Sequence, residues 1–201
     1  MIISSVSVKG GSGKTTICLN LASYFVLEGY KVIIIDADIN GNITRFLDSR
    51  PDEAPAIPHA VLNSESDFKN NFDDITKGYD IVLIDGRPAI DSLAFYLLMI
   101  SNVAIIPIKP SPLDMWTNDD IFMKIYHKAN DKNTDLRSFF LMNCVKPATN
   151  LLYECKALLY DYKANTNITT LDAEITDRVI YAESIMQGLG VLEMKAAKYA
   201  T

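Results

Sequence analysis

The sequence predicts an α/β fold in which a doubly wound, mostly parallel sheet is flanked by helices. Short runs rich in valine and isoleucine recur along the chain, and segments with helical spacing of apolar residues separate them. The runs are almost continuously apolar, which is typical of parallel strands buried on both faces. Alternation of such strands with helices indicates right-handed βαβ crossovers, and hence a parallel sheet.

The periodicity assigns each element to a range. Strands are predicted at 2–8, 31–36, 80–85, 103–108 and 138–142, with a weaker one at 167–171. Helices are predicted at 15–27, 113–129, 151–163 and 175–187. Gly29 follows the first helix at the position where helices commonly stop. The proline-rich segment 49–58 predicts an irregular connection.

Length and composition favour a single domain over residues 1–201, with 49% apolar and 22% charged residues. The formal net charge of −6 and the pI near 4.9 argue against a protein that coats nucleic acid through bulk charge. The cysteines, Cys18, Cys144 and Cys155, show no CxxC spacing, which excludes a disulfide framework and a zinc finger. The N-terminus lacks a signal-peptide pattern and no apolar run is long enough to span a bilayer, so we expect a cytoplasmic protein.

The segment between the first predicted strand and the first predicted helix has the composition of a phosphate-binding loop. It consists of Lys9, Gly10, Gly11, Ser12, Gly13, Lys14, Thr15 and Thr16. Glycines let backbone N–H groups approach anionic oxygens closely, and the helix N-terminus adds unpaired N–H groups and a favourable dipole. Lys14 supplies positive charge to the β- and γ-phosphates, and the Thr15 hydroxyl is a ligand for Mg²⁺. A strict Walker A pattern requires glycine at position 8, where this chain has Val8.

Three aspartates stand at the ends of predicted strands. Asp36 and Asp38 end the second strand, and Asp85 ends the strand at 80–85, which has the form of a Walker B strand. Because the carboxyl ends of strands face the ligand crevice in doubly wound sheets, we expect these carboxylates close to the phosphates. A cation bound to phosphates keeps several waters, and Asp85 is placed to hold one of them.

Lysine at position 9, with glycines at 10, 11 and 13, resembles the deviant Walker A box, KGGxGKT[ST], of the ParA/MinD superfamily. Later segments resemble its short, ParF-type ParA proteins, and the resemblance extends from the first strand to about Val191. It implies ATP and Mg²⁺ as cofactors, and catalytic roles for Lys9, Lys14 and Asp38. In that superfamily the extra lysine, here Lys9, reaches across a nucleotide-sandwich dimer to the partner's phosphates. A cation supplied in this way couples nucleotide state to dimerisation.

Residues 36–42 resemble switch I of ParA-like proteins, usually D-x-D-P-Q-G-N. The resemblance implies that Asp38 positions the attacking water and that Asp36 supports the magnesium shell. Ile39 and Asn40 stand where that pattern has Pro and Gln, which leaves open how this switch moves. The implied metal site consists of Thr15, Asp36 and Asp85.

The resemblance also implies roles for later residues. Pro110 lies in a segment that follows the fourth family strand, near the nucleotide base and the dimer surface. Asn143 matches an asparagine that hydrogen-bonds the adenine edge in MinD-like relatives, and an asparagine in a plain turn fits the pattern equally well. Arg178 is the position for DNA contact, because late arginines serve that role in ParA relatives. Arg87 fits a surface or dimer contact better than an arginine finger.

The function that the resemblance implies is that of an ATPase that partitions plasmid or other DNA cargo. Its ATP-loaded subunits form a homodimer that binds nonspecific DNA weakly, and a small centromere-binding ParB-like partner stimulates hydrolysis. Such a protein is cytoplasmic, associates with the nucleoid when ATP is bound and makes no membrane contact.

Other functions remain open. A MinD-like positioning protein needs a C-terminal amphipathic membrane helix, and residues 189–201 make a poor one. A carboxysome or chemoreceptor-cluster positioning ATPase would keep the mechanism and change the cargo. A small-molecule ligase of the dethiobiotin-synthetase type would use the same loop, although Lys9 and the paired aspartates favour a switch. The row Lys124, Lys128 and Lys132 predicts a solvated helix face rather than a DNA-binding one.

Overall fold

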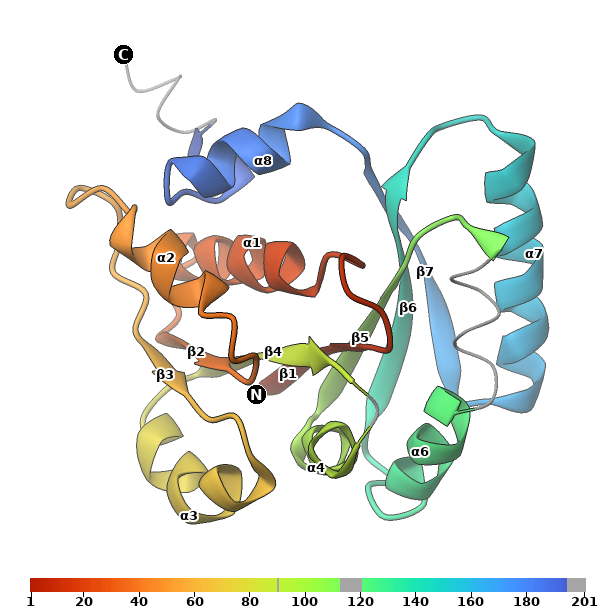
Figure 1. Ribbon diagram of the computed structural model, residues 1–201, viewed down its shortest axis with the longest axis horizontal. Helices are drawn as coiled ribbons and strands as arrows, with labels where there is room; N and C mark the ends of the chain where they lie inside the picture. Colours follow the sequence, from red (N-terminus) through yellow and green to blue (C-terminus); the bar gives the residue numbers. More distant parts are fainter. Residues whose placement is uncertain (90, 113–120, 195–201) are drawn as a thin grey trace.

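The computed structural model describes residues 1–89, 91–112 and 121–194, which contain a seven-stranded sheet (Figure 1). The strands are β1 (Ile2–Ser7), β2 (Val32–Asp36), β3 (His59–Val61), β4 (Ile81–Pro88), β5 (Val103–Ile108), β6 (Arg137–Val145) and β7 (Ile168–Thr176). Their order is β3-β2-β4-β1-β5-β6-β7, and all neighbouring pairs are parallel. The chain winds outward to β3, returns to β4 beside β1 and continues through β5 on the other side. The predicted doubly wound sheet is confirmed, and its crevice lies at the carboxyl end of β1, where the winding reverses.

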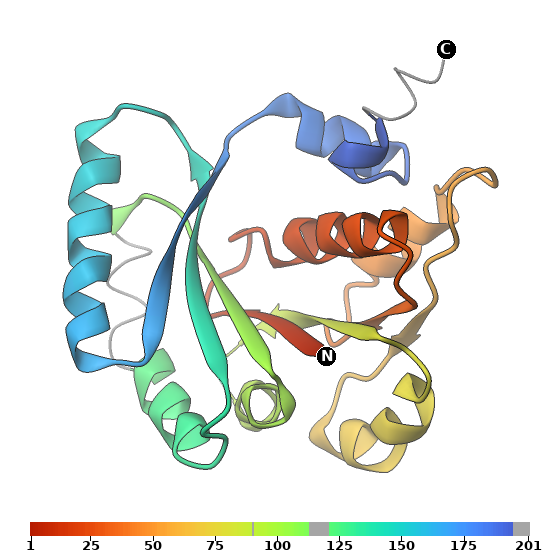
Figure 2. The same ribbon diagram turned by 180° about the vertical axis from the view of Figure 1, so that it is seen from behind.

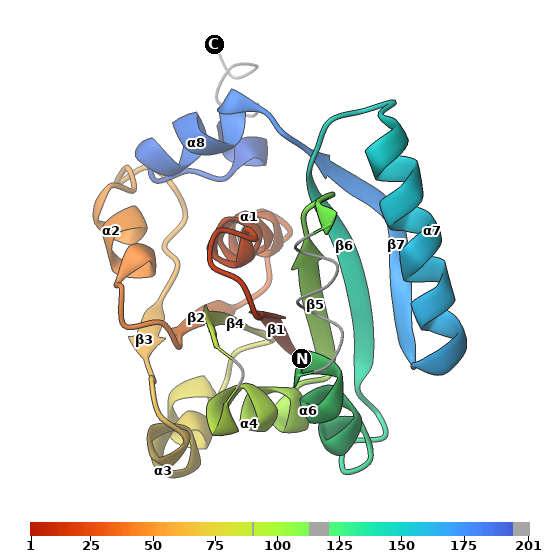
Figure 3. The same ribbon diagram turned by 45° about the vertical axis from the view of Figure 1, so that its right-hand side comes forward.

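Helices cover both faces of the sheet. The described helices are α1 (Lys14–Leu27), α2 (Asn42–Asp48), α3 (Glu65–Thr76), α4 (Ser92–Ile100), α6 (Ile121–Asn130), α7 (Asn150–Asn165) and α8 (Val179–Met186). Figures 2 and 3 show α1, α2 and α8 on one face and α3, α4, α6 and α7 on the other. Among the described residues, no helix has the length and apolar character that crossing a membrane requires.

Each face of the sheet has its own apolar core, and successive strand residues alternate between the two. In β2, Val32 and Ile34 pack toward α1 and α2, whereas Ile33 and Ile35 pack toward α3 and α4. All four side chains are at most 3% exposed. Burying such a side chain contributes about 1.5–3 kcal/mol, which explains why a run apolar at every position forms a central strand. Cys18 of α1 is buried in the core that lies between the sheet and helices α1 and α2.

The predicted strands are all present, and those at 80–85, 138–142 and 167–171 extend further as β4, β6 and β7. The helices predicted at 15–27 and 151–163 correspond to α1 and α7. Of the helix predicted at 113–129, residues 113–120 lie outside the described residues, and α6 accounts for the remainder. The segment 49–58 is irregular, as predicted.

The helix predicted at 175–187 starts too early. Ile175 and Thr176 belong to β7, where Thr176 pairs with Val145 of β6, and the chain becomes helical only at Val179. Both are β-branched residues that fit a strand, and the ladder with β6 outweighs the helical spacing that follows them. The sequence pattern predicts no element where α2, β3, α3 and α4 lie.

The start of α4 is fixed by a single carboxylate. Asp91 accepts hydrogen bonds from the backbone N–H groups of Leu93 (3.0 Å) and Ala94 (3.1 Å). The same carboxylate forms an ion pair with Arg87 at the end of β4. Asp91 therefore joins the end of a central strand to the helix that follows it.

We expect Asp91→Ala to lower the free energy of unfolding by about 1–2 kcal/mol, because α4 loses its cap and Arg87 loses its partner. Urea denaturation measures the change. Asp91→Asn keeps an acceptor for the helix N–H groups and should retain most of the stability. Equal losses in the Ala and Asn variants would mean that the charge, and not the cap, is what matters at this position.

Candidate functional site

The loop between β1 and α1 has the backbone geometry that anion binding requires. Gly13 has φ of 103°, a conformation that a residue with a side chain rarely adopts. A Cβ atom at Gly13 would lie 2.0 Å from Nδ2 of Asn143, so only glycine fits between the loop and β6. No side chain caps the N-terminus of α1. Its N–H groups therefore face the loop, and an anion bound there would meet them together with the helix dipole.

Lys14 is held inside this loop rather than extended into solvent. Its residue is 6% exposed, and its Nζ donates to Ser7 Oγ (3.2 Å) and to the carbonyl oxygen of Lys9 (3.1 Å). Ser7 Oγ also lies 2.6 Å from Ser12 Oγ. Burial lowers the pKa of Lys14, and the nearby Asp85 and Asp38 oppose that shift. The ammonium group is thus preorganised at the centre of the loop.

Two of the predicted aspartates meet at adjacent strand ends. Asp36 of β2 and Asp85 of β4 are partners in the parallel register, and both are buried. Thr15 Oγ1 donates to Asp85 Oδ2 at 2.7 Å, which places the first turn of α1 against this pair. Among the residues that the structure describes, Asp85 Oδ1 and Asp36 Oδ2 have no hydrogen-bond partner.

The protonation of this pair reflects its burial. Burial raises the pKa of Asp85 to about 7, and the neighbouring Asp36 adds to the increase. Burial also raises the pKa of Asp36. Two buried, unpartnered carboxylate oxygens beside a threonine hydroxyl are hard oxygen donors of the kind Mg²⁺ prefers. The residues present therefore fit the metal ion that the sequence predicts.

Asp38 lies at the start of the loop after β2, and its carboxylate contacts its own loop. Asp38 Oδ1 accepts from the backbone N–H of Asn40 (3.2 Å) and from Asn40 Nδ2 (2.8 Å). The N–H of Asp38 donates to Asp36 Oδ1 at 3.0 Å, which ties this loop to the buried pair. Ile39, between them, is 76% exposed. The substitution of Asn40 for the usual glutamine thus places an amide directly on Asp38.

Two clefts open beside the loop. The first, the phosphate cleft, has a volume of about 310 Å³ and is lined by loop residues with Asp38, Asn40 and Asn42. The second, the lateral cleft, has a volume of about 170 Å³ and is lined by residues of α1, β6, β7 and α8. Gly11, Gly13 and Thr16 line both clefts. The two clefts are therefore adjoining, and together they suit a ligand with an anionic end and a flat end.

The remaining predicted residues differ in whether they line the two clefts. Asn143 donates through Nδ2 to the carbonyl oxygen of Ser12 (2.7 Å) and lines the lateral cleft, as does Arg178. Lys9 is half-buried beside the loop, and its carbonyl oxygen accepts from Lys14. Pro110 lies two residues after β5 and is not among the residues that line either cleft. Arg87 forms an ion pair with Asp91.

Sequence reasoning missed several residues that shape the site. Ser7 holds Lys14 and Asn40 holds Asp38 through side-chain hydrogen bonds, and Asn20 and Tyr181 line the lateral cleft. Ser7 and Asn40 are close in sequence to the motif residues, and this proximity is the one feature of the sequence that indicates a role for them in the site. Nothing in the spacing of Asn20 or Tyr181 indicates that they share a cleft.

Comparison with known proteins gives a family match over nearly the whole chain. Residues 3–191 match the model described as "CobQ/CobB/MinD/ParA nucleotide binding domain". A curated relative, "Maintenance of carboxysome distribution protein A" from Halothiobacillus neapolitanus, is 25% identical over 191 residues, which cover 94% of this chain and 86% of the relative. The chain spans only 41% and 54% of two further curated relatives.

Solved structures confirm the fold. The septum site-determining protein MinD from Pyrococcus horikoshii, complexed with Mg-ADP, has a TM-score of 0.68 at 21% identity and covers 97% of this chain and 88% of its own. A plasmid partition protein from Borrelia burgdorferi, bound to AMPPNP, has a TM-score of 0.68 at 19% identity and covers 98% of both chains. Both comparisons show the P-loop arrangement of a parallel sheet between helices.

The raised pKa of Asp85 predicts how stability depends on pH without nucleotide or metal. Between about pH 4 and pH 7 the folded protein retains a proton on Asp85 that the unfolded chain has lost, so the free energy of unfolding falls as pH rises through this window. Asp85→Asn has no carboxyl group at this position, so its free energy of unfolding should not fall in this way. At pH 8 in EDTA we expect its Tm to be about 5–10 °C above that of the native sequence, corresponding to roughly 2–4 kcal/mol.

Differential scanning calorimetry at pH 5 and pH 8 measures the effect, and the two proteins should differ much less at pH 5. Asp73→Asn, at an exposed position on α3, serves as the matched control and should leave the Tm unchanged at both values. If Asp85→Asn raised the Tm equally at both pH values, the carboxylate would not be the group that titrates.

Proposed function

Because this chain belongs to the CobQ/CobB/MinD/ParA family of nucleotide-binding domains, we propose that it is an ATPase switched by Mg²⁺-ATP that positions cargo in the cell. The observation that carries the proposal is the meeting of four groups at one strand edge: the ammonium of Lys14, the hydroxyl of Thr15 and the carboxylates of Asp36 and Asp85. This combination binds a triphosphate and its cation, and it supplies no covalent nucleophile.

Each group has a defined role in this proposal. The backbone N–H groups of Gly10 to Thr16 and the ammonium of Lys14 bind the phosphates, and they neutralise charge that develops during cleavage. Thr15, Asp36 and Asp85 would hold Mg²⁺, and the ion would supply positive charge to the phosphates. Because a carboxylate holds a cation only when ionised, Asp85 would take part in this site in its deprotonated form.

Asp38 orients the attacking water once its carboxylate leaves Asn40. The hydrogen bonds from Asn40 to Asp38 Oδ1 hold this carboxylate against its own loop in the structure, and we propose that the switch loop rearranges to bring it to the attacking water. A slow unstimulated rate follows, since the productive arrangement is not the resting one. We propose that dimerisation and a partner protein favour the rearranged loop.

Lys9 completes the site of a second subunit in this proposal. Two subunits with nucleotide between them would each supply an ammonium group to the other's phosphates, so the dimer would be stable only in the nucleotide-loaded state. The adenine base would lie in the lateral cleft, near Asn143 and Arg178. Arg178 lines this cleft and is also exposed, and we propose it as a contact for DNA, which the dimer would hold through weak, shallow contacts.

The cargo is proposed to be DNA, with a small ParB-like protein as the link. A second candidate is a protein compartment such as the carboxysome, which is favoured by the relative that matches 94% of this chain. Both use the same switch. In either case we propose a cytoplasmic protein that associates with the nucleoid when ATP is bound.

Subunit mixing tests the exchange of Lys9 between subunits. Lys9→Ala and Asp38→Ala are each expected to lose ATP turnover. Lys9→Ala removes the ammonium group from the site of the partner subunit, whereas Asp38→Ala removes a carboxylate from the subunit's own site. In a mixed dimer, the Lys9→Ala subunit keeps its own Asp38 and receives Lys9 from its partner, so one site is complete. Mixing equal amounts before ATP is added should restore about a quarter of native turnover, because half the dimers are mixed and each has one working site.

A mixture of Lys9→Ala with the double variant Lys9→Ala/Asp38→Ala is the matched control and should remain inactive. If the first mixture were no more active than its components, while the native protein hydrolysed ATP, Lys9 would act within its own subunit or not at all.

The cargo is tested by adding candidate partners to the ATPase assay one at a time. We expect the protein encoded beside this chain to raise turnover by about tenfold or more, and duplex DNA to cosediment with the protein only in ATP. Pelleting with anionic lipid vesicles in ATP would instead support a MinD-like function. Stimulation by a small metabolite, with no response to DNA or protein, would support a ligase.

A further inference from the structure

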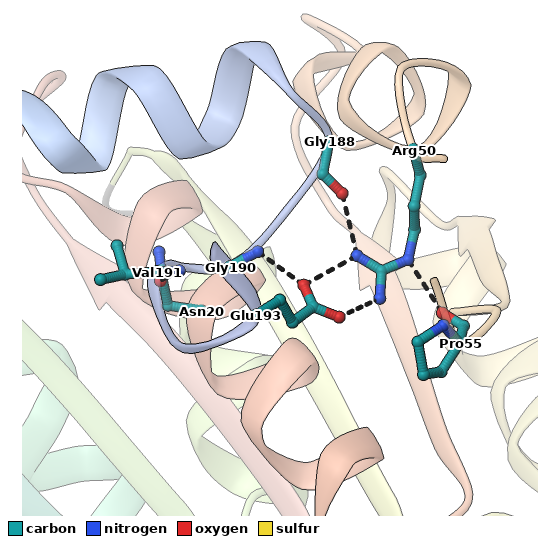
Figure 4. A network of polar contacts seen from close by, with 7 residues as sticks. All are labelled: Asn20, Arg50, Pro55, Gly188, Gly190, Val191 and Glu193. Atoms are coloured by element: carbon teal, nitrogen blue, oxygen red, sulfur yellow. Dashed lines mark hydrogen bonds and ion pairs between the residues drawn. The ribbon is translucent and has the colours of Figure 1, made fainter. Parts of the chain in front are cut away.

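A buried ion pair joins two segments that are 143 residues apart (Figure 4). Arg50, just after α2, pairs with Glu193 near the end of the described chain, and both side chains are 5% exposed. Arg50 Nη1 donates to Glu193 Oε2 (3.0 Å) and to the carbonyl oxygen of Gly188 (2.9 Å), and its Nε donates to the carbonyl oxygen of Pro55 (2.8 Å). We call this arrangement the Arg50–Glu193 clamp.

The clamp secures the turn that follows α8, residues 188–191, between two helices. Glu193 Oε2 also accepts from the N–H of Gly190 at 2.6 Å, and the N–H of Val191 donates to Asn20 Oδ1 of α1 at 2.9 Å. Gly188 has φ of +64°, and a Cβ there would lie 2.4 Å from the Arg50 backbone. The turn is therefore packed directly against the end of α2 on one side and α1 on the other.

The position of α8 connects the clamp to the lateral cleft. Arg178 and Tyr181, at the N-terminal end of α8, line that cleft. The turn at residues 188–191, which the clamp secures, follows the C-terminal end of α8. Ile185, between them, lines a groove with Asn42 and Phe46 of α2. A helix of eight residues is about 12 Å long and moves as a unit, so fixing its C-terminal end also fixes the residues at its N-terminal end.

The energetics indicate a role other than simple stabilisation. Burying two charges is energetically costly, and an apolar pair of similar volume is often as stable or more so. The guanidinium fork, by contrast, fixes orientation, because Arg50 meets acceptors in Glu193, Gly188 and Pro55 at once. The clamp therefore specifies where α8 lies more than how stable the protein is.

We infer that Arg50 and Glu193 are positioning residues that set the lateral cleft for the base of the nucleotide, without taking part in binding its phosphates. The inference rests on the proposed nucleotide binding. Neither residue lines the phosphate cleft or the lateral cleft. The clamp acts through α8 and through Asn20, which donates to the Thr16 carbonyl at 2.8 Å and holds Val191 through its Oδ1.

The variant that tests this role removes both charges. Arg50→Met/Glu193→Leu leaves no unpaired buried charge, and we expect it to fold with a Tm near that of the native protein. Its affinity for a fluorescent ADP analogue with Mg²⁺ should fall about tenfold, since the base contacts are lost. Its affinity for inorganic tripolyphosphate with Mg²⁺ should change less than about twofold, because that ligand has no base.

Lys156→Met/Glu174→Leu is the matched control, because it removes another ion pair, which joins α7 to β7 and lines neither cleft. It should bind both ligands as the native protein does. Equal loss of affinity for ADP and tripolyphosphate in the Arg50 and Glu193 variant would show a purely structural role and overturn the inference. Unchanged affinity for both would overturn it too. Failure of the native protein to bind either ligand would refute the proposed function instead.

If the double variant does not fold, hydrogen exchange on the native protein gives the answer. The Mg²⁺ complex of ADP should slow exchange at the N–H groups of Gly190 and Val191, whereas tripolyphosphate should not. Equal protection by both ligands, or by neither, would contradict the inference, since the turn would then not respond to the base.

Discussion

The site depends on two carboxylates that the sheet forces together. Parallel pairing of β2 with β4 places Asp36 opposite Asp85, and the helices on both faces exclude water from the pair. Ionising both costs energy in this setting, which is why burial raises the pKa of each. The nearby ammonium of Lys14 offsets this cost only partly, since it is itself desolvated. The divalent cation that we propose for this site would relieve the remaining repulsion. The two buried carboxylates thus oppose each other's ionisation in the structure, and binding of the cation would remove that cost.

The central strands and the phosphate loop could be predicted because each is a characteristic run of consecutive residues. Strands such as β2 are apolar at every position, so they were recognised without knowledge of their neighbours. The elements that were missed lack such a signature. The strand β3 has only three residues, and α3 buries only Phe68 and Phe72 on an otherwise polar helix. The start of α8 was misplaced because the spacing of apolar residues cannot show that Thr176 pairs with Val145.

The candidate site was predictable to the same extent. Lys14, Thr15 and Asp85 follow from motifs whose chemistry is local, and the structure brings them together. The contacts that orient them are of two kinds. Asn40 lies two residues after Asp38. Its difference from the family pattern is visible in the sequence, but the hydrogen bond that it donates to Asp38 is not. Asn143 and Ser12 are 131 residues apart, and only the packing of β6 against the loop makes them partners. Pairings of that length cannot be obtained from spacing.

The two clefts differ in how they are built, and this difference has a consequence for the switch. The phosphate-binding groups come from one short segment between β1 and α1, at the centre of the sheet, where backbone geometry leaves little freedom. The lateral cleft is assembled from α1, β6, β7 and α8, and the turn that follows α8 is held by Arg50 and by Asn20. Small changes in α8 can therefore alter how a base fits while the phosphate chemistry stays intact. Because α2 begins directly after the loop that contains Asp38, and ends beside Arg50, a rearranged switch would reach α8 through the same contacts.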